Sequence, residues 1–275
     1  MAQAFKKSDI EILLSTMNRD SLDFLTPMFP FTHFTEFKIL IINQTTQENI
    51  LQSPYVNIRV INSFEKGLSK SRNLALANAG GKIALMTDDD VIFKEGFDET
   101  IYTAFNAFPD AALIKFCAAA FEGKLFRKYT RHAVKNMNAM QRLNTMSIEI
   151  ALNVERVKQS GIIFNALFGL GSFFSMGEEP IFVNDLHKAG FQVSFVPKTI
   201  VTHKSVKDSD NIAISEVYRI RGAYLKKIFD KQFFLWVGIQ LMYHLKGRVI
   251  TPFQIPFCIK NALKGRKQLL NLTEK

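Results

Sequence analysis

Cysteine is scarce in this chain. Its 275 residues include only Cys117 and Cys258, which lie far apart and outside any CxxC pattern. This excludes a disulfide framework and a cysteine-based zinc site, and it favours a reducing compartment such as the cytoplasm. The first twenty residues have no separate apolar segment followed by a small-residue cleavage site, so we expect no secretory signal.

Long hydrophobic runs are also missing. The longest apolar stretch is FFLWVGIQLMYHL at 233–245, which is interrupted by Gln240 and His244. A membrane-spanning helix needs about 20 apolar residues, so we expect that this stretch does not span a bilayer. The hydrophobic content of 47% is nevertheless ample for a core in a chain of this length, and it excludes a disordered or fibrous protein.

The chain has no acidic region that offsets its positive tail. Residues 1–218 hold 23 basic and 23 acidic residues, whereas 12 basic residues from Arg219 onward accompany only Asp230 and Glu274. The whole formal net charge of +10 therefore lies in the tail. Basic residues on both sides of an apolar stretch are typical of a helix on an anionic membrane surface, and we expect such contacts through 219–267. The alternatives are a helix that packs on the rest of the protein and a basic segment that binds nucleic acid.

The first hundred residues alternate between apolar runs and helix-prone segments. Four apolar runs predict buried strands, at 10–15, 37–42, 56–60 and 83–87. Before the last run, Ser69 is expected to cap a helix that stops near Gly80. This alternation predicts an α/β, Rossmann-like fold with a mostly parallel sheet and flanking helices. Ligands of such sheets bind beyond the carboxyl ends of the strands, where the polar clusters at 16–19, 43–45 and 88–90 would meet.

The pattern after residue 110 is less regular. Residues 111–121 predict another strand, but 124–160 show no clear periodicity. A helix is expected from about Glu179 to Lys188, followed by two short strands, and the chain beyond 211 is helical and basic. We therefore expect one α/β domain at 1–210 and a helical tail at 211–275. Within the domain we expect a first half at about 8–110 and a second half at about 111–210.

Three consecutive aspartates, Asp88, Asp89 and Asp90, follow the strand predicted at 83–87. Carboxylates this close repel one another unless a cation compensates them. Mg²⁺ or Mn²⁺ is the economical explanation, because these ions prefer oxygen ligands and keep positions open for substrate phosphates. A solvated acidic turn, or a cap for a following helix, is the alternative.

Several segments occur in an order and spacing that resemble the family 2 glycosyltransferases, which have the GT-A fold. The segments are STMNR at 15–19, GLSKSRN at 67–73, DDD at 88–90, GEE at 177–179 and the histidine of VTHKS at 201–205. STMNR is similar to the family's segment at the end of the first strand, and DDD to its DxD motif. Each motif alone has moderate specificity, but their order indicates the family, and the resemblance covers roughly residues 8–205.

The resemblance implies roles for particular side chains. Donor-binding residues would be Thr16, Asn18, Arg19, Asn43, Lys70, Arg72, Asp88 and Asp89. A divalent metal, Mn²⁺ or Mg²⁺, would be held by Asp90, Asp88 and His203. Glu179 stands where the family has its catalytic base, and Glu178 and Asp185 are the rival carboxylates.

The resemblance also implies the reaction and its setting. A sugar would pass from a nucleotide-sugar donor to a hydroxyl of a glycan or polyprenyl-linked acceptor, in surface polysaccharide biosynthesis, at the inner face of the plasma membrane. The metal, helped by Arg72 or Lys70, would stabilise the charge that develops on the leaving diphosphate. Glu179 would take the hydroxyl proton as general base, and in-line displacement would invert the anomeric centre.

Two departures from the family pattern leave other functions open. The second strand ends in Asn43-Gln44 where the family commonly has an acidic pair, and amides offer donors as well as acceptors, so uracil specificity does not carry over. Glu179 replaces an aspartate, and its extra methylene moves the carboxylate by about one bond length. A catalytically inactive glycosyltransferase-like binding subunit is therefore the alternative function. A nucleic-acid-binding protein is less favoured, because the sequence shows no recognised nucleic-acid module.

Overall fold

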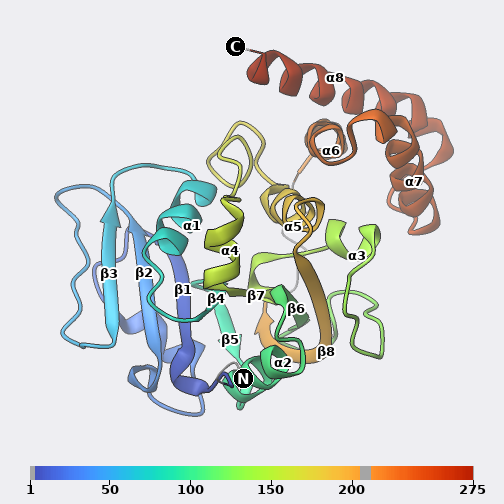
Figure 1. Cartoon of the computed structure of the whole chain (residues 1–275). Helices are drawn as coiled ribbons and strands as arrows, with labels where there is room; N and C mark the ends of the chain where they lie inside the picture. Colours follow the sequence, from blue (N-terminus) through green and yellow to red (C-terminus); the bar gives the residue numbers. More distant parts are fainter. Residues whose placement is uncertain (1–3, 205–211, 275) are drawn as a thin grey trace.

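The computed structural model describes residues 4–204 and 212–274. An eight-stranded sheet with the order β3-β2-β1-β4-β7-β6-β8-β5 forms its centre (Figure 1). The strands are β1 (Ile10–Met17), β2 (Lys38–Gln44), β3 (Ile58–Ser63), β4 (Ile83–Asp88), β5 (Val91–Phe93), β6 (Ala111–Ala120), β7 (Ile150–Asn153) and β8 (Gln192–His203). This mixed sheet with flanking helices confirms the expected α/β, Rossmann-like architecture.

The first four strands pair in parallel, and β1, β2 and β4 are buried almost throughout, whereas the edge strand β3 is only partly buried. β1 lies between β2 and β4, and β3 pairs with β2 at the sheet edge. Ile12 and Leu14 of β1 point into one hydrophobic core, while Leu13 points into the other. A parallel strand with both faces covered needs apolar side chains on both, which explains why these strands are continuous apolar runs in the sequence.

Helices cover the two faces of the sheet. α1 (Leu68–Ala77), α4 (Val154–Ser160) and α5 (Glu178–Lys188) contribute buried side chains to the core on one face. α2 (Phe97–Ala107) packs into the core on the opposite face. The polar clusters predicted at the carboxyl ends of β1, β2 and β4 lie together at one edge of the sheet.

The start of α1 differs from the prediction that Ser69 caps it. The N-cap is Gly67, whose φ of 124° lies in the region that favours glycine. Ser69 is buried within the first turn, and its hydroxyl donates a 2.6 Å hydrogen bond to the carbonyl of Phe168. The Ser69 hydroxyl therefore makes a tertiary hydrogen bond instead of capping the helix as the sequence pattern predicts.

The end of the sheet differs from the prediction of two short strands. β8 is one strand of 12 residues that pairs with β6 in parallel and with β5 antiparallel. Its register against β6 shifts around Pro197, because Phe195 pairs with Lys115 while Thr199 pairs with Cys117. Proline cannot donate a ladder hydrogen bond, so the strand bulges there instead of ending.

The segment without sequence periodicity consists of short elements. Residues 124–160 contain α3 (Ala139–Leu143), the 3-10 turn η4 (Ser147–Glu149), β7 and α4. Elements of three to seven residues are too brief for a hydrophobic period to emerge. The other 3-10 turns are η1 (Lys7–Asp9), η2 (Asp23–Met28), η3 (Phe34–Glu36), η6 (Asp230–Gln232) and η7 (Pro252–Gln254).

The tail forms three helices with their own hydrophobic cluster. They are α6 (Ile214–Phe229), α7 (Phe233–Lys246) and α8 (Ile255–Thr273), and Figure 1 shows them grouped beyond α5 and α3. α6 and α8 approach closely at two glycines: a Cβ on Gly222 would lie 2.0 Å from the carbonyl oxygen of Ala262, and one on Gly265 would lie 1.7 Å from that of Arg219. No helix of residues 4–204 and 212–274 is both long and apolar enough to cross a membrane. The expected division between 210 and 211 lies outside the described residues.

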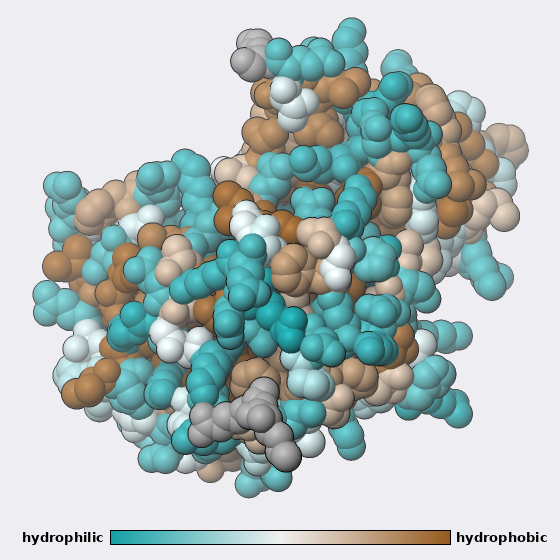
Figure 2. Space-filling model, viewed as in Figure 1, coloured by the Kyte–Doolittle hydropathy of each residue, from teal (hydrophilic) through white to brown (hydrophobic). Residues whose placement is uncertain are grey.

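The tail also carries exposed hydrophobic side chains. Phe233 is buried, whereas Phe234, Leu235 and Met242 of the same helix α7 are 64%, 60% and 69% exposed. Phe253 before α8 is 95% exposed. Figure 2 shows brown hydrophobic surface interleaved with teal hydrophilic surface over the region of α6 to α8. The apolar stretch at 233–245 is therefore divided between an inner face that packs and an outer face that meets solvent.

Candidate active site

The carboxyl ends of β1 and β4 meet through Asp89. The Thr16 hydroxyl, on β1, donates a 2.5 Å hydrogen bond to the Asp89 carboxylate. Arg19 donates to the same oxygen from Nε at 3.1 Å and from Nη2 at 2.7 Å. The prediction that the polar clusters at 16–19 and 88–90 lie together is therefore confirmed by direct contacts.

Asn43 joins the end of β2 to the same edge. Its side-chain oxygen accepts a hydrogen bond from the backbone N–H of Arg19, and its amide donates to the Arg19 carbonyl, both at 3.0 Å. Asn18 bends the chain here with a φ of 53°, a left-handed conformation that asparagine tolerates, and its N–H donates to the carbonyl of Gln44. The Asn43 side chain thus holds the loop after β1 in place. Its two hydrogen bonds need both a donor and an acceptor, which an amide supplies.

Arg72 is the centre of a buried group of carboxylates. It lies on α1 with only 2% of its side chain exposed. Nη1 donates to Glu178 and to Glu179, both at 2.9 Å, and Nη2 donates to Asp88 at 3.2 Å. Burial alone lowers the pKa of Arg72, but the three carboxylates outweigh it and raise the pKa above its usual value. The guanidinium therefore stays charged and links the strand end to the start of α5.

Glu178 and Glu179 occupy different environments although they are adjacent. Both lie in the first turn of α5, where the helix dipole favours negative charge. Glu178 is buried, and its Oε2 has no hydrogen-bond partner among the described residues. Burial and then the charge of Glu179 raise the pKa of Glu178 to about 8, which Arg72 opposes. Glu179 is more exposed, at 14% of its side chain, and is therefore the carboxylate that an acceptor reaches more easily.

The remaining two aspartates of the DDD segment face different partners. Asp88 accepts hydrogen bonds from Arg72 and, at 3.0 Å, from the hydroxyl of Ser147 on η4. Asp90 lies 3.0 Å from Nε2 of His203, at the end of β8. This pairing lowers the pKa of Asp90 and raises the pKa of His203. Residues 113 positions apart in sequence are thus in contact, as the resemblance implied.

The Asp90 and His203 pair is chemically suited to a divalent cation. One carboxylate oxygen and one imidazole nitrogen point at each other, and the Asp90 side chain is 61% exposed. A nitrogen and an oxygen ligand fit Mn²⁺ well, and phosphate oxygens of a donor are the usual remaining ligands. Within the described residues, no three His, Cys, Asp or Glu side chains gather as a metal-binding group. Asp88 is held by Arg72 and Ser147, so the protein's own donor set here is a pair.

Two residues considered from the sequence lie apart from this cluster. Lys70 makes an ion pair of 2.7 Å with Glu65, and both side chains are largely exposed. Asp185 is on α5, but the charges that act on it belong to Lys227 and Lys188, and burial raises its pKa. Neither residue makes a hydrogen bond or ion pair with the DDD segment, Glu178 or Glu179 in the described structure.

Two neighbours of the site were not found by sequence reasoning. Ser147 binds Asp88, and Phe126 places its ring 6.2 Å from the His203 ring. Both belong to the part of the chain that showed no periodicity, and neither lies in a motif. Only the tertiary structure brings them to the strand ends, so the sequence contained no signal for them.

Known proteins share the family and the fold of this chain. Residues 35–168 match the family model described as glycosyl transferase family 2. This match is shorter than the resemblance at 8–205, and it contains Arg72 and the DDD segment but ends before Glu179 and His203. No curated protein matches the sequence.

Solved structures of TarS from S. aureus have a similar fold. TarS 1-349 shares 16% sequence identity and a TM-score of 0.54, and the match covers 80% of this chain and 66% of that chain. TarS 1-349 in complex with UDP-GlcNAc shares 15% identity and a TM-score of 0.56, with 79% of this chain and 66% of that chain covered. TarS 1-349 in complex with UDP shares 14% identity and a TM-score of 0.56, with 93% and 80% covered.

Sequence identities at this level show a common fold. The family match spans β2 to β7 and α1 to α4, and the match to TarS 1-349 covers 80% of the chain. The family match at 35–168 and the shared fold therefore identify a glycosyltransferase domain of the family 2 type, with the GT-A fold, in this chain.

Proposed function

We propose that this protein transfers a sugar from a nucleotide-sugar donor to a hydroxyl of a glycan or polyprenyl-linked acceptor, with inversion at the anomeric centre. The observation that carries the proposal is the hydrogen-bonded group formed by Asp88, Arg72 and Glu179. This group connects the Asp88 carboxylate, at the end of β4, to the Glu179 carboxylate, at the start of α5. TarS, which has a similar fold, has been crystallised with UDP-GlcNAc and with UDP, which supports a nucleotide-sugar donor.

The donor would lie over the carboxyl ends of the first, second and fourth strands. Thr16, Arg19 and Asn43 form this edge, and Arg19 offers a positive charge to a diphosphate. Asn18 holds the loop after β1 in the left-handed conformation that shapes the edge. Arg72 is less available to a phosphate, because its N–H groups are directed at three carboxylates.

Asp90 and His203 would hold the divalent cation, Mn²⁺ or Mg²⁺, and Asp88 would lie beside them. When bound, the cation supplies Lewis-acid stabilisation of the charge on the leaving diphosphate. The protein's own part is to place one oxygen and one nitrogen ligand 3.0 Å apart at the end of β8. Asp89 does not take part in this pair, because Thr16 and Arg19 bind its carboxylate.

Glu179 would be the general base. A base must reach the acceptor hydroxyl within hydrogen-bond distance, and Glu179 is the more exposed of the two adjacent glutamates. Arg72 orients its carboxylate through the 2.9 Å hydrogen bond. Proton removal on one side and departure of the diphosphate on the other describe an in-line displacement with one base, which inverts the anomeric centre.

The division of the chain and its cellular setting belong to the same proposal. Residues 1–210 would form the catalytic domain and 211–275 the basic extension. Lys260, Lys264 and Lys267 of α8 line a surface depression with Phe257 and Leu263, a mixture that suits anionic lipid headgroups above an apolar layer. A peripheral position at the inner face of the plasma membrane would bring the enzyme to a lipid-linked acceptor of surface polysaccharide synthesis.

A ligand panel tests the proposal. We expect UDP-, GDP-, dTDP- or CDP-sugars to raise the melting temperature of the full chain in the presence of Mn²⁺, since a ligand of the native state stabilises it by mass action. Asp90→Asn should abolish the Mn²⁺-dependent part of the shift, while Asp110→Asn, an exposed aspartate elsewhere, should retain it. Absence of a shift with every donor would remove the proposed function. Inversion is checked by assigning the anomer of the product by NMR.

A binding subunit without catalytic activity is the second candidate. Two observations favour it: Asn43 is engaged by the Arg19 backbone, and Glu179 is longer than the family's aspartate. Such a subunit would bind the donor but would not consume it. Metal-dependent turnover or hydrolysis of a bound nucleotide sugar would exclude this candidate.

A further inference from the structure

A cavity of about 520 Å³ lies beside the candidate active site, between β6, the segment at 126–130, α3 and α7. Its volume is in the range of small-molecule sites. Three of its lining residues carry positive charge, Lys115, Arg127 and Lys128, and none of the lining residues is acidic. Most other lining side chains are aromatic or are neutral hydrogen-bonding groups. Charge and size therefore point to an anionic organic ligand.

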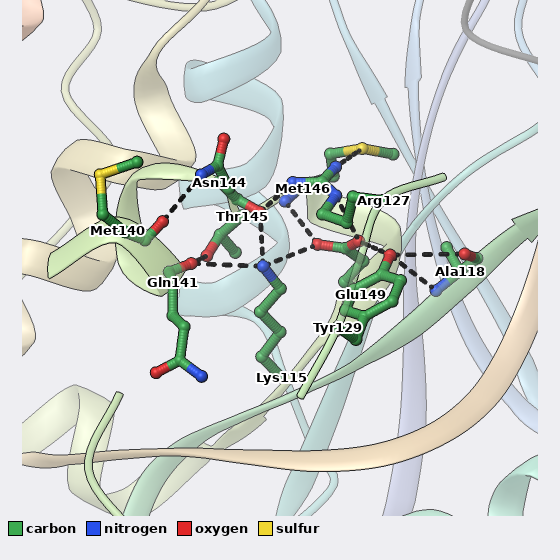
Figure 3. Close-up of polar contacts among 10 residues, drawn as sticks. All are labelled: Lys115, Ala118, Arg127, Tyr129, Met140, Gln141, Asn144, Thr145, Met146 and Glu149. Carbon is green, nitrogen blue, oxygen red and sulfur yellow. Dashed lines mark hydrogen bonds and ion pairs between the residues drawn. The ribbon is translucent and has the colours of Figure 1, made fainter. Parts of the chain in front are cut away.

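A buried carboxylate behind the cavity fixes two of these cations. Glu149 is fully buried and lies 3.3 Å from Nζ of Lys115 and 3.6 Å from Nε of Arg127. Tyr129 donates a 2.5 Å hydrogen bond to the same carboxylate. Figure 3 shows Lys115 approaching Glu149 from one side, with Tyr129 and Arg127 on the other. One negative charge is thus shared by two cations, which keeps their positions rigid.

The charges around the cavity do not cancel. Glu149 offsets one of the three cations that line it, so about two positive charges remain. Lys128 is exposed, and it forms no ion pair with a carboxylate among the described residues. A phosphate monoester carries about two negative charges at neutral pH, which matches this excess.

The aromatic side chains suit the body of a sugar. Tyr129 and Phe195 are stacked with their ring centroids 5.9 Å apart and their planes at 4°. Tyr243 of α7 closes the cavity from the tail. Flat aromatic faces bury the apolar faces of sugar rings, while the surrounding cations bind charged substituents.

The cavity is joined to the candidate active site at two points. η4 holds both Ser147, which binds Asp88, and Glu149, which binds the cavity cations. Phe126 lines the cavity and lies 6.2 Å from the ring of His203. The donor-binding edge at Thr16 and Asn43 lies on the other strands, so a ligand in the cavity would approach the reaction centre from the acceptor side.

We propose that this cavity binds a phosphoryl group of the acceptor, so that the acceptor is a phosphorylated sugar or a related phosphate ester. The identification of the ligand as the acceptor rests on the proposed function. The existence of an anion-binding site is argued from the cavity alone. Lys128 contacts the phosphoryl group, Lys115 and Arg127 supply the fixed field, and the aromatic rings pack on the adjoining sugar.

Fluorine NMR of the full chain labelled with 3-fluorotyrosine tests the site directly. The protein has six tyrosines, and two of them, Tyr129 and Tyr243, line the cavity. Resonances are assigned with single Tyr→Phe variants, and the probe is glucose 6-phosphate in the absence of donor and metal. We expect the Tyr129 and Tyr243 resonances to shift in a saturable manner, and glucose or potassium chloride at the same concentration to leave them unchanged.

Charge-reversal variants supply the matched comparison. Lys128→Glu should weaken the probe's affinity by about tenfold or more, as expected when a contact to a charged group is lost. The control is Lys135→Glu, which changes an exposed lysine seven residues further along the chain that does not line the cavity, and it should bind the probe like the unmodified protein. Equal shifts with glucose, no saturable shift with the phosphate, or equal losses in the two variants would overturn the anion site.

UDP with Mn²⁺ separates this inference from the proposed function. Saturating UDP should leave the probe's affinity unchanged, because donor and acceptor occupy different sites. Displacement of the probe by UDP would place the donor diphosphate in the cavity and overturn the acceptor assignment. A protein whose melting temperature responds to none of the four types of nucleotide sugar with Mn²⁺, but whose cavity binds the probe, would retain the anion site and lose the proposed function.

Discussion

Arg72 of α1 donates a 2.9 Å hydrogen bond to Glu179 of α5, although 107 positions separate them in the sequence. The same nitrogen donates to Glu178, and the other terminal nitrogen donates to Asp88. A single guanidinium therefore fixes the distance between the strand-end aspartates and the proposed base. Its burial also makes it a structural element, because three acidic side chains accept hydrogen bonds from it.

Glu179→Gln should lower kcat by about 10²-fold or more, because glutamine keeps the shape and the contact with Arg72 but cannot accept the proton. Donor affinity should stay nearly constant. Steady-state kinetics and donor titrations check both quantities. Glu178→Gln is the matched comparison, and a large loss of kcat in that variant with normal activity in Glu179→Gln would exchange the roles of the two residues.

Arg72→Ala should destabilise the protein by about 3 kcal/mol, because removal of one partner leaves buried carboxylates without compensation. Lys70→Ala, two positions earlier on the exposed side of α1, should change stability by less than about 0.5 kcal/mol. Urea unfolding of both variants gives the comparison. Similar stabilities for the two would mean that the Arg72 cluster contributes little to folding.

Stability should fall as pH rises through the window set by Glu178. Its pKa of about 8 in the folded protein lies above the ordinary value of 4.5, so the folded state holds a proton that the unfolded chain has released. The contribution is therefore complete below pH 4.5 and is lost as pH rises through 8, with a slope of at most about 1.4 kcal/mol per pH unit for one proton. Glu178→Gln removes this slope. Urea unfolding at several pH values should show the two proteins diverging, and parallel curves would contradict the raised pKa.

Asp90→Ala should abolish metal-dependent donor binding without loss of the fold. The side chain is 61% exposed, so its removal leaves little cavity, and it withdraws one of three adjacent negative charges. Isothermal titration with Mn²⁺ and a nucleotide sugar measures the first effect, and the melting temperature measures the second. Metal-dependent binding that persists in the variant would remove Asp90 from the metal assignment.

Replacing Phe234, Leu235 and Met242 by serine should abolish binding to anionic vesicles with little change in melting temperature, because these side chains are exposed on α7. Val56→Ser with Ile163→Ser, exposed apolar residues outside the tail, is the control and should bind normally. Vesicle sedimentation at several salt concentrations measures the affinity.

Two outcomes bear on the vesicle prediction. Phe233→Ser should lower the melting temperature instead, since Phe233 is 2% exposed and packs in the tail cluster. Undiminished vesicle binding of the triple variant would exclude membrane contact through this face of α7.

The sequence predicted the parts of the molecule that depend on local pattern. The apolar runs gave the first strands and β4, and parallel pairing then required their polar ends to meet, as Thr16 and Asp89 do. The start of α5 and the helical tail also follow from spacing and composition. These features need only a period or a cluster of polar residues at the end of an apolar run.

The remaining features depend on contacts between distant segments. Ser147 and Phe126 reach the site from a region without periodicity, and β8 stays continuous past Pro197 because β6 pairs on both sides of its bulge. We expect from the sequence that Arg72 or Lys70 helps to stabilise the diphosphate, but one terminal nitrogen of Arg72 donates to both glutamates of α5 and the other donates to Asp88. Such contacts form only when the chain has folded, so no short stretch of the sequence predicts them.

The contact between α5 and the tail has a mechanical consequence. Gly177 precedes the two glutamates, and a Cβ there would lie 2.8 Å from Cδ1 of Tyr224 on α6. Gly222 and Gly265 allow α6 to approach α8 with even less space, 2.0 Å and 1.7 Å from an added Cβ to the nearest atom. α8 therefore packs on α6, and α6 packs on the backbone that precedes the proposed base Glu179. Removal of the chain beyond Arg219 would take Tyr224 away from Gly177 and leave the start of α5 without this packing.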